Sequence, residues 1–75
     1  MPHVLVKLVP GKTEEQKRAL TDAISQSVQQ HLGSTEDEVS VAFEEVPMEQ
    51  WAETVYRPEI VGCPDKIYKK PGYTL

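Results

Sequence analysis

Two segments of the chain alternate apolar and polar residues with the period of a β-strand. Residues 3–9 read HVLVKLV, and alternate positions beginning with Val4 place apolar side chains on one face. Residues 39–46 read VSVAFEEV and end before Pro47, which cannot continue the hydrogen bonding of a central strand. We therefore predict a β-strand in each segment.

The segment between them has the period of an α-helix. Thr13 followed by Gln16 has the form of a capping box, in which the Thr hydroxyl and the Gln amide satisfy the first free backbone N–H groups. Gly33 stands where a helix commonly ends. The apolar stripe consists of residues at four-residue spacing, Leu20, Ile24, Val28 and Leu32. This pattern predicts a helix over residues 13–32.

Two strands separated by a helix predict a β-α-β unit with parallel strands and a right-handed crossover. A two-stranded sheet is not stable by itself in water, and a chain of 75 residues buries only a marginal core. Cys63 is the only cysteine, so no disulfide forms within the chain, and His3 and His31 have no further ligand at metal spacing. We therefore predict an α+β fold with one domain over residues 1–75, whose two strands join a larger sheet through oligomerisation.

Prolines interrupt the pattern after the second strand. Residues 48–56 have the spacing of a short helix, with Trp51 and Val55 on one face. Residues 57–75 hold too many apolar side chains for a free arm. We expect them to form short helical or hairpin pieces that pack on a neighbouring surface.

The composition limits the partners of the chain. It has 8 Lys and Arg against 12 Asp and Glu, a net charge of −4 and a pI near 5.0, which argues against nucleic-acid binding. No segment has the length of a membrane span, and the first residues lack the pattern of a signal peptide. We therefore expect a cytoplasmic protein with no nucleic-acid or membrane partner.

Pro2 is the sharpest chemical feature. Removal of Met1 would expose a secondary amine at the start of the first strand. An α-amino group has a pKa of about 7.7–8.0, which an apolar pocket or a nearby cation lowers toward neutrality, so that the amine becomes a good proton acceptor. Such an amine can take a proton from the carbon next to a carbonyl and return it elsewhere. The alternative is that Met-Pro is only a common chain start.

One order of features runs through the whole chain: Pro2, a strand, Lys12, the segment TEEQK at residues 13–17, a second strand and Trp51. Further segments are LGS at 32–34, SVA at 40–42, PMEQW at 47–51 and KKPGY at 69–73. This layout resembles the 4-oxalocrotonate tautomerase-like group of the tautomerase superfamily, and the further segments resemble its dimeric bacterial phenylpyruvate-type branch. The resemblance implies enol–keto tautomerisation of 2-oxo acids without a metal or organic cofactor.

The resemblance also implies roles for single residues. Pro2 matches the family's catalytic amino-terminal proline, and Trp51 matches the aromatic residue that lines the substrate pocket. An aromatic wall excludes water and disfavours the charged form of the proline. Lys12 occupies the position of an arginine that holds a substrate carboxylate in hexameric relatives. The alternatives are that Trp51 is a core anchor and that Lys12 is a solvated loop cation.

Ser40 departs from the family pattern, because hexameric relatives have a second arginine there that polarises the substrate carbonyl. A serine hydroxyl donates a hydrogen bond without a charge, so we expect a monocarboxylate such as an aryl 2-oxo acid more than a dicarboxylated muconate-type substrate. His3 follows the proline and is either a substrate-binding residue or an ordinary strand residue. Candidates for the missing cation, from this subunit or a neighbour, are Arg57, Lys69 and Lys70.

The predicted function is therefore a tautomerase that works as a homo-oligomer on a small 2-oxo acid. We expect a dimer rather than a hexamer, because the tail is longer than in the hexameric relatives and would cover the surfaces on which their dimers stack. Two alternatives remain. One is a non-catalytic dimer whose Pro2 stays blocked by Met1, and the other is a dehalogenase or decarboxylase of the same fold, for which the missing second arginine is unfavourable.

Overall fold

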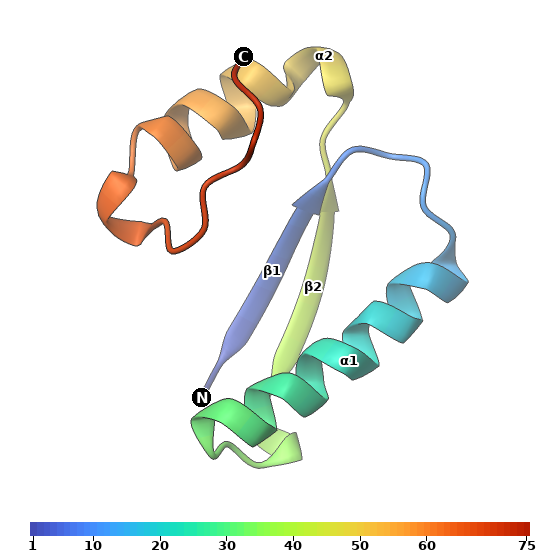
Figure 1. Ribbon diagram of the computed structural model, residues 1–75. Helices are drawn as coiled ribbons and strands as arrows, with labels where there is room; N and C mark the ends of the chain where they lie inside the picture. The colour runs from blue at the N-terminus through green and yellow to red at the C-terminus, as the bar shows by residue number, and fades with distance from the viewer. The chain divides into compact units, whose positions relative to one another are not determined.

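The computed structural model describes residues 1 to 75, which form two compact units, Met1–Glu45 and Val46–Leu75. The first unit contains β1 (His3–Leu8), α1 (Glu14–Leu32), the 3₁₀ turn η1 (Glu36–Glu38) and β2 (Ser40–Glu45) (Figure 1). The second contains α2 (Met48–Trp51), the π-helix η2 (Ala52–Val61) and the 3₁₀ turn η3 (Pro64–Lys66). A single domain over the whole chain stays a prediction.

The two strands pair in parallel, as the β-α-β prediction requires. The register runs from His3 opposite Ser40 to Leu8 opposite Glu45. Each strand is one or two residues shorter than its predicted segment. α1 connects the end of β1 to the beginning of β2 and lies along one face of the sheet (Figure 1). The predicted α+β fold with one β-α-β unit is confirmed.

The two faces of the sheet differ in what covers them within the first unit. Phe43 lines a shallow cavity together with Lys17 and Thr21 of α1, so its side chain faces the helix. Because side chains alternate along a strand, every second residue of β2 and its partner in β1 share that face. The opposite face carries His3, Leu5, Ser40 and Ala42.

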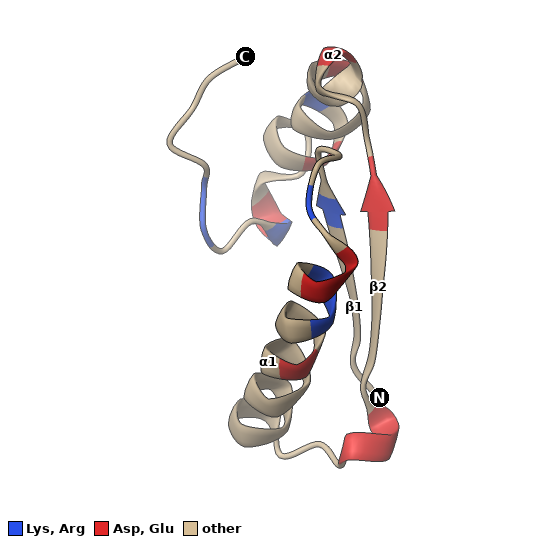
Figure 2. Cartoon of the chain, turned by 90° about the vertical axis from the view of Figure 1, so that its right-hand side faces the viewer, with Lys and Arg blue, Asp and Glu red and all other residues tan.

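The first unit has little buried interior. The chain's three buried residues, Val46, Val55 and Tyr56, all lie in the second unit. No residue of α1 is buried, and Leu20 and Leu32 of its apolar stripe are 43% and 68% exposed. The C-terminal half of α1 also carries no Lys, Arg, Asp or Glu (Figure 2). The β-α-β unit therefore exposes apolar helix surface, in keeping with its predicted marginal core.

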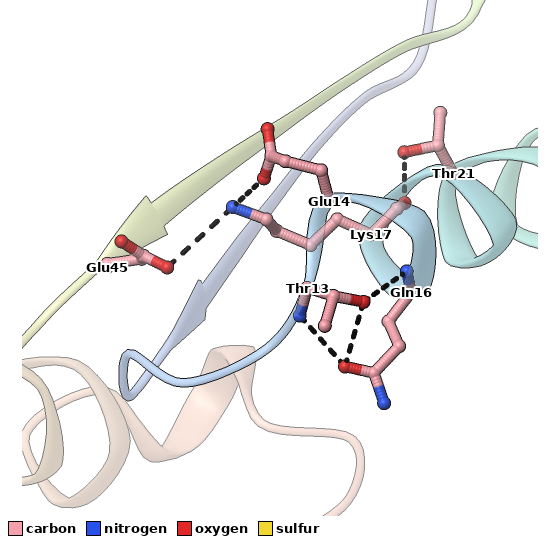
Figure 3. Close-up of polar contacts among 6 residues, drawn as sticks. All are labelled: Thr13, Glu14, Gln16, Lys17, Thr21 and Glu45. Carbon is pink, nitrogen blue, oxygen red and sulfur yellow. Dashed lines mark hydrogen bonds and ion pairs between the residues drawn. The ribbon is translucent and has the colours of Figure 1, made fainter.

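α1 begins at the predicted capping box and ends at the predicted glycine. Oγ1 of Thr13 accepts a hydrogen bond from the backbone N–H of Gln16 at 3.0 Å, and Oε1 of Gln16 accepts one from the backbone N–H of Thr13 at 2.9 Å (Figure 3). Gly33 has a φ of 71°, which favours glycine, and its N–H donates to the carbonyl of Gln29 at 3.1 Å. Thr13 is the cap, so the helix itself begins at Glu14.

The second unit is helical over more residues than the sequence predicts. The predicted helix over residues 48–56 forms, but α2 continues without a break into η2 as far as Val61. The wider π turns include Pro58, which has no N–H to donate. The N–H of Gly62 closes the segment by donating to the carbonyl of Arg57 at 2.8 Å. The prediction ended the helix early because a proline breaks a regular α-helix.

The backbone carbonyl groups of Arg57 and Pro58 lie close to Gly62. A Cβ at this position would lie 2.8 Å from the carbonyl oxygens of both Arg57 and Pro58. Beyond it, η3 is a short helical piece of the kind expected, and residues 67–75 have no regular secondary structure. None of the helices is both long enough and apolar enough to cross a membrane.

Candidate active site

Three of the five predicted site residues meet at the beginning of the sheet. Because the strands are parallel, the residues that precede and open β1 lie beside the residue that opens β2. The backbone N–H of Ser40 donates to the carbonyl of Pro2 at 3.2 Å, and His3 is the register partner of Ser40. Pro2 is partly buried, whereas His3 and Ser40 are exposed.

The side chains of His3 and Ser40 are hydrogen-bonded. Nδ1 of His3 lies 2.6 Å from Oγ of Ser40, on the sheet face opposite α1. When the imidazole proton is on Nε2, the Ser40 hydroxyl donates to Nδ1. When the proton is on Nδ1, Ser40 accepts, and its own hydroxyl hydrogen is free to donate to a substrate oxygen. The tautomer of His3 therefore decides whether Ser40 offers a hydrogen bond at this edge.

The amine at the start of the chain lies near a carboxylate. The Met1 nitrogen is 3.9 Å from Oε2 of Glu38 in η1. Hydrogen bonds from the backbone N–H of Thr35 at 2.9 Å and from its hydroxyl at 3.2 Å, together with the nearby amine, hold the pKa of Glu38 below its usual value. With Met1 attached, the Pro2 nitrogen is an amide nitrogen and accepts no proton.

Lys12 lies at the other end of β1 from Pro2. β1 has six residues, and at roughly 3.3 Å per residue the strand is about 20 Å long. The loop between β1 and α1 lies at the opposite end of the sheet from the N-terminus (Figure 1). Lys12 is exposed in that loop. Within one chain, the fold does not bring this cation to Pro2.

A second cation at that end binds two carboxylates. Nζ of Lys17 lies 2.5 Å from Oε2 of Glu14 and 3.7 Å from Oε2 of Glu45 (Figure 3). The hydrogen bond to Glu14 is the largest cause of a raised pKa of Lys17, and Lys17 in turn lowers the pKa of Glu14. Lys17 thus ties the start of α1 to the end of β2. Sequence reasoning missed this residue, and its only local signal is the three-residue spacing from Glu14.

Trp51 lies in the second unit, at the end of α2. Its indole N–H donates to the hydroxyl of Tyr73 at 3.0 Å. The Tyr73 ring lies against the ring of buried Tyr56, with centroids 5.6 Å apart and 38° between the planes. Tyr73 and Tyr56 also line a cavity of about 340 Å³, whose wall is mostly apolar and holds Lys70 as its one cation. Sequence reasoning missed Tyr73. A tryptophan indole usually has a hydrogen-bond partner when it is buried, but the sequence does not identify which residue that partner is.

Other polar residues are bound within local structure. No group of three or more His, Cys, Asp or Glu side chains is placed to hold a metal ion. Nδ1 of His31 lies 2.8 Å from the carbonyl oxygen of Ser27, one turn earlier in α1. The Cys63 thiol donates to the carbonyl of Pro58 at 3.4 Å. These contacts give His31 and Cys63 structural partners and leave them outside the predicted site.

Comparison with known proteins places the chain in a family. Residues 2–56 match the sequence profile of the family described as "Tautomerase enzyme". The tautomerase PptA of Cronobacter sakazakii is 42% identical over 76 residues, which cover 100% of both chains. The crystal structure of YwhB, a homologue of 4-oxalocrotonate tautomerase, is similar with a TM-score of 0.60 and 37% identity, over 61% of this chain and 75% of that chain.

A further structural likeness concerns the fold alone. A structure from a study of trans-3-chloroacrylic acid dehalogenase activity matches with a TM-score of 0.63 over 65% of this chain and 92% of that chain, at 22% identity. The β-α-β fold is therefore shared by proteins with different reactions. The profile match and the full-length relative decide the assignment, and the chain belongs to the tautomerase enzyme family, in the group that resembles 4-oxalocrotonate tautomerase.

Proposed function

We propose that this tautomerase interconverts the enol and keto forms of 2-oxo monocarboxylic acids, aryl pyruvates foremost, with the nitrogen of Pro2 as its acid–base catalyst. The observation that carries the proposal is the meeting of Pro2 with the bonded pair His3 and Ser40 at the start of the two strands. Both polar side chains lie on the sheet face opposite α1. A substrate at this edge would have the proline nitrogen and a hydroxyl donor within reach together.

The proposed reaction is a proton transfer in two steps. Removal of Met1 converts the Pro2 nitrogen from an amide into a secondary amine with a free electron pair. This nitrogen accepts the proton of the enol hydroxyl, and the carbonyl bond forms as the double bond between the carbons opens. The resulting ammonium group then delivers its proton to the carbon, which yields the keto acid and restores the amine. A positioned base of this kind contributes about a hundred- to ten-thousandfold in rate.

His3 and Ser40 would bind the substrate rather than move the proton. A His3 tautomer with the proton on Nδ1 donates to Ser40, which leaves the serine hydroxyl hydrogen for the carbonyl or carboxylate oxygen of the substrate. This donor has no charge. A monocarboxylate fits such a site better than a muconate-type dicarboxylate, whose second negative charge would have no partner here.

We further propose that the site is completed by another copy of the chain, most simply in a homodimer. β1, about 20 Å long, separates Pro2 from the loop that holds Lys12, so a Lys12 that binds the substrate carboxylate comes from a neighbouring subunit. The two-stranded sheet also has two open edges, and α1 buries none of its residues. Pairing of sheets and covering of α1 by a second copy would supply the interior that one unit lacks.

The decisive experiment concerns the amino terminus. Intact mass and amino-terminal sequencing of protein from its natural host establish whether Met1 is removed. Processed protein should accelerate ketonisation of the phenylpyruvate enol, followed by ultraviolet absorbance. The matched control carries one extra residue between Met1 and Pro2 that resists trimming, so that the Pro2 nitrogen stays an amide, and it should lose about a hundred- to ten-thousandfold in rate.

Several outcomes would overturn the proposal. Full activity in protein shown by mass to carry a blocked Pro2 would move the search for the base to His3 and Lys12. Retention of Met1 in protein from the natural host would favour the non-catalytic dimer. No activity of correctly processed protein on the enol would remove the proposed reaction, and turnover of a haloacrylate in place of the enol would favour the dehalogenase.

A further inference from the structure

We propose that Tyr73 is a positioning residue for Trp51, and that the C-terminal segment thereby sets the affinity of the enzyme for the aryl group of its substrate. The inference rests on the proposed function and on the role that the family resemblance implies for Trp51, the aromatic wall of the substrate pocket. Tyr73 lies outside residues 2–56, which the family profile matches. The family profile therefore says nothing of its role.

The contact between the two residues is specific. The indole of tryptophan has one polar atom, the Nε1–H group, which only donates. In this chain it donates to the hydroxyl of Tyr73 at 3.0 Å, across 22 residues of sequence. α2 holds the backbone of Trp51, but two side-chain torsions still decide where the ring plane points. A hydrogen bond at the far edge of the indole restricts both torsions, so Tyr73 selects one orientation of the ring.

Tyr73 is anchored on one side and partly exposed on the other. Its ring lies 5.6 Å from that of Tyr56, which is only 9% exposed and anchors the pair to the interior of the unit. Tyr73 as a whole is 44% exposed, and it also lines the cavity of about 340 Å³. The hydrogen bond that orients Trp51 is therefore made by a side chain whose ring is held against buried Tyr56.

The expected effect falls on substrate binding. An aromatic wall contacts the aryl group equally in the ground state and the transition state, because the aryl group does not change during proton transfer. Loss of such uniform binding raises KM and leaves kcat unchanged. The pH profile, which reports the proton-transferring group, should also stay unchanged. A general loss of structure would lower kcat as well. A change in KM alone therefore indicates a positioning role for Tyr73, and a change in both constants indicates a loss of folded structure.

The experiment uses the full chain with Tyr73→Phe, which keeps the ring and removes only the hydroxyl. Trp51 is the only tryptophan, so intrinsic fluorescence reports directly on it. We expect lower fluorescence anisotropy, stronger acrylamide quenching, and a KM for the phenylpyruvate enol raised about threefold to tenfold, the range of one net hydrogen bond. The matched control is Tyr68→Phe, the same change at a tyrosine that is 101% exposed, and it should alter none of these quantities.

A double-mutant cycle completes the test. In a Trp51→Phe background the indole donor is absent, so Tyr73→Phe should no longer change KM. Provided that the wild type is active, two results would contradict the role of Tyr73. One is an equal effect of Tyr73→Phe in both backgrounds, and the other is unchanged quenching and unchanged KM in the single variant. If processed wild-type protein does not convert the enol at all, the proposed function fails and the effect on KM fails with it, whereas the quenching still decides whether Tyr73 orients Trp51.

Discussion

Nδ1 of His3 and Oγ of Ser40 lie 2.6 Å apart, which joins the first residues of two strands that are 37 positions apart in the sequence. The parallel register makes this pair possible, because His3 and Ser40 are direct partners whose side chains leave the sheet on the same face. The bond therefore links His3, which follows the proposed catalytic Pro2, to Ser40, which stands where the hexameric relatives have an arginine.

Ser40→Ala should raise the KM for the phenylpyruvate enol about threefold to tenfold, because the substrate oxygen loses one hydrogen-bond donor. Ser40→Thr keeps the hydroxyl and should stay within about twofold of the wild type. His3→Phe should add nothing in the Ser40→Ala background if the imidazole acts only through the serine. Steady-state kinetics on the three variants test this, and an unchanged KM in Ser40→Ala would remove the serine from the site.

Pro2→Ala should leave a primary amine in nearly the same place after Met1 is removed. We expect a fraction of the wild-type activity and a shifted midpoint in the pH dependence of kcat/KM, because the basicity of the amine and its fit change while the proton transfer remains possible. Mass spectrometry of the same sample confirms the processing. An identical pH profile in wild type and Pro2→Ala would show that another group titrates in the reaction.

Lys12→Ala and a chain with a blocked Pro2 should complement each other when mixed and allowed to form dimers. Each is defective alone, but a hybrid dimer unites the intact Pro2 of one chain with the intact Lys12 of the other. Random pairing restores about a quarter of the wild-type sites in a dimer with two-fold symmetry. Activity before and after subunit exchange measures the gain, and light scattering gives the oligomer mass. No gain despite proven exchange would mean that Lys12 does not act across subunits.

Lys17→Gln should lower the melting temperature at neutral pH, because it breaks the contacts with Glu14 and Glu45. The pKa of Glu14 is lowered in the folded state, so its contribution is lost as the pH falls through that lowered value, below 4.5. The pKa of Lys17 is raised, so its contribution is lost as the pH rises through that raised value, above 10.5. The difference from wild type should therefore shrink at both extremes of pH.

High salt should also reduce the effect of Lys17→Gln, because the carboxylates of both ion pairs are open to solvent. Lys69→Gln, at an exposed lysine, is the control for loss of one positive charge. An equal change in melting temperature for the two variants would assign the effect to net charge and leave no role for the contacts of Lys17.

Gly62→Ala should destabilise the protein by about 1–3 kcal/mol, because the added Cβ meets two backbone oxygens that cannot move as a flexible side chain would. A Cβ at this position lies 2.8 Å from the carbonyl oxygens of Arg57 and Pro58. Gly72→Ala meets no atom within 4 Å and should change stability by less than about 0.5 kcal/mol. Urea denaturation of both variants measures the difference, and equal midpoints would contradict the close approach.

The sequence by itself determined the elements whose signals are local. The Thr13 cap bonds a residue three positions away, and Gly33 closes the helix onto Gln29 four positions back. These hydrogen bonds need no other part of the chain, so residue type and spacing suffice to predict them. The two alternating segments likewise placed both strands to within a residue at each end. The same local reasoning ended the second helix too early, at Tyr56, whereas the wider turns of η2 include Pro58.

Only the tertiary structure decided which side chains meet. Ser40 reaches His3, Lys17 reaches Glu45, and Trp51 reaches Tyr73 across 37, 28 and 22 residues. Such contacts depend on strand register, on the face that α1 covers and on the path of an irregular tail, none of which has a periodic signal in the sequence. The sequence named Pro2 and Lys12 as parts of one site, but the length of β1 holds them at opposite ends of the strand, because an extended chain of six residues cannot fold back on itself.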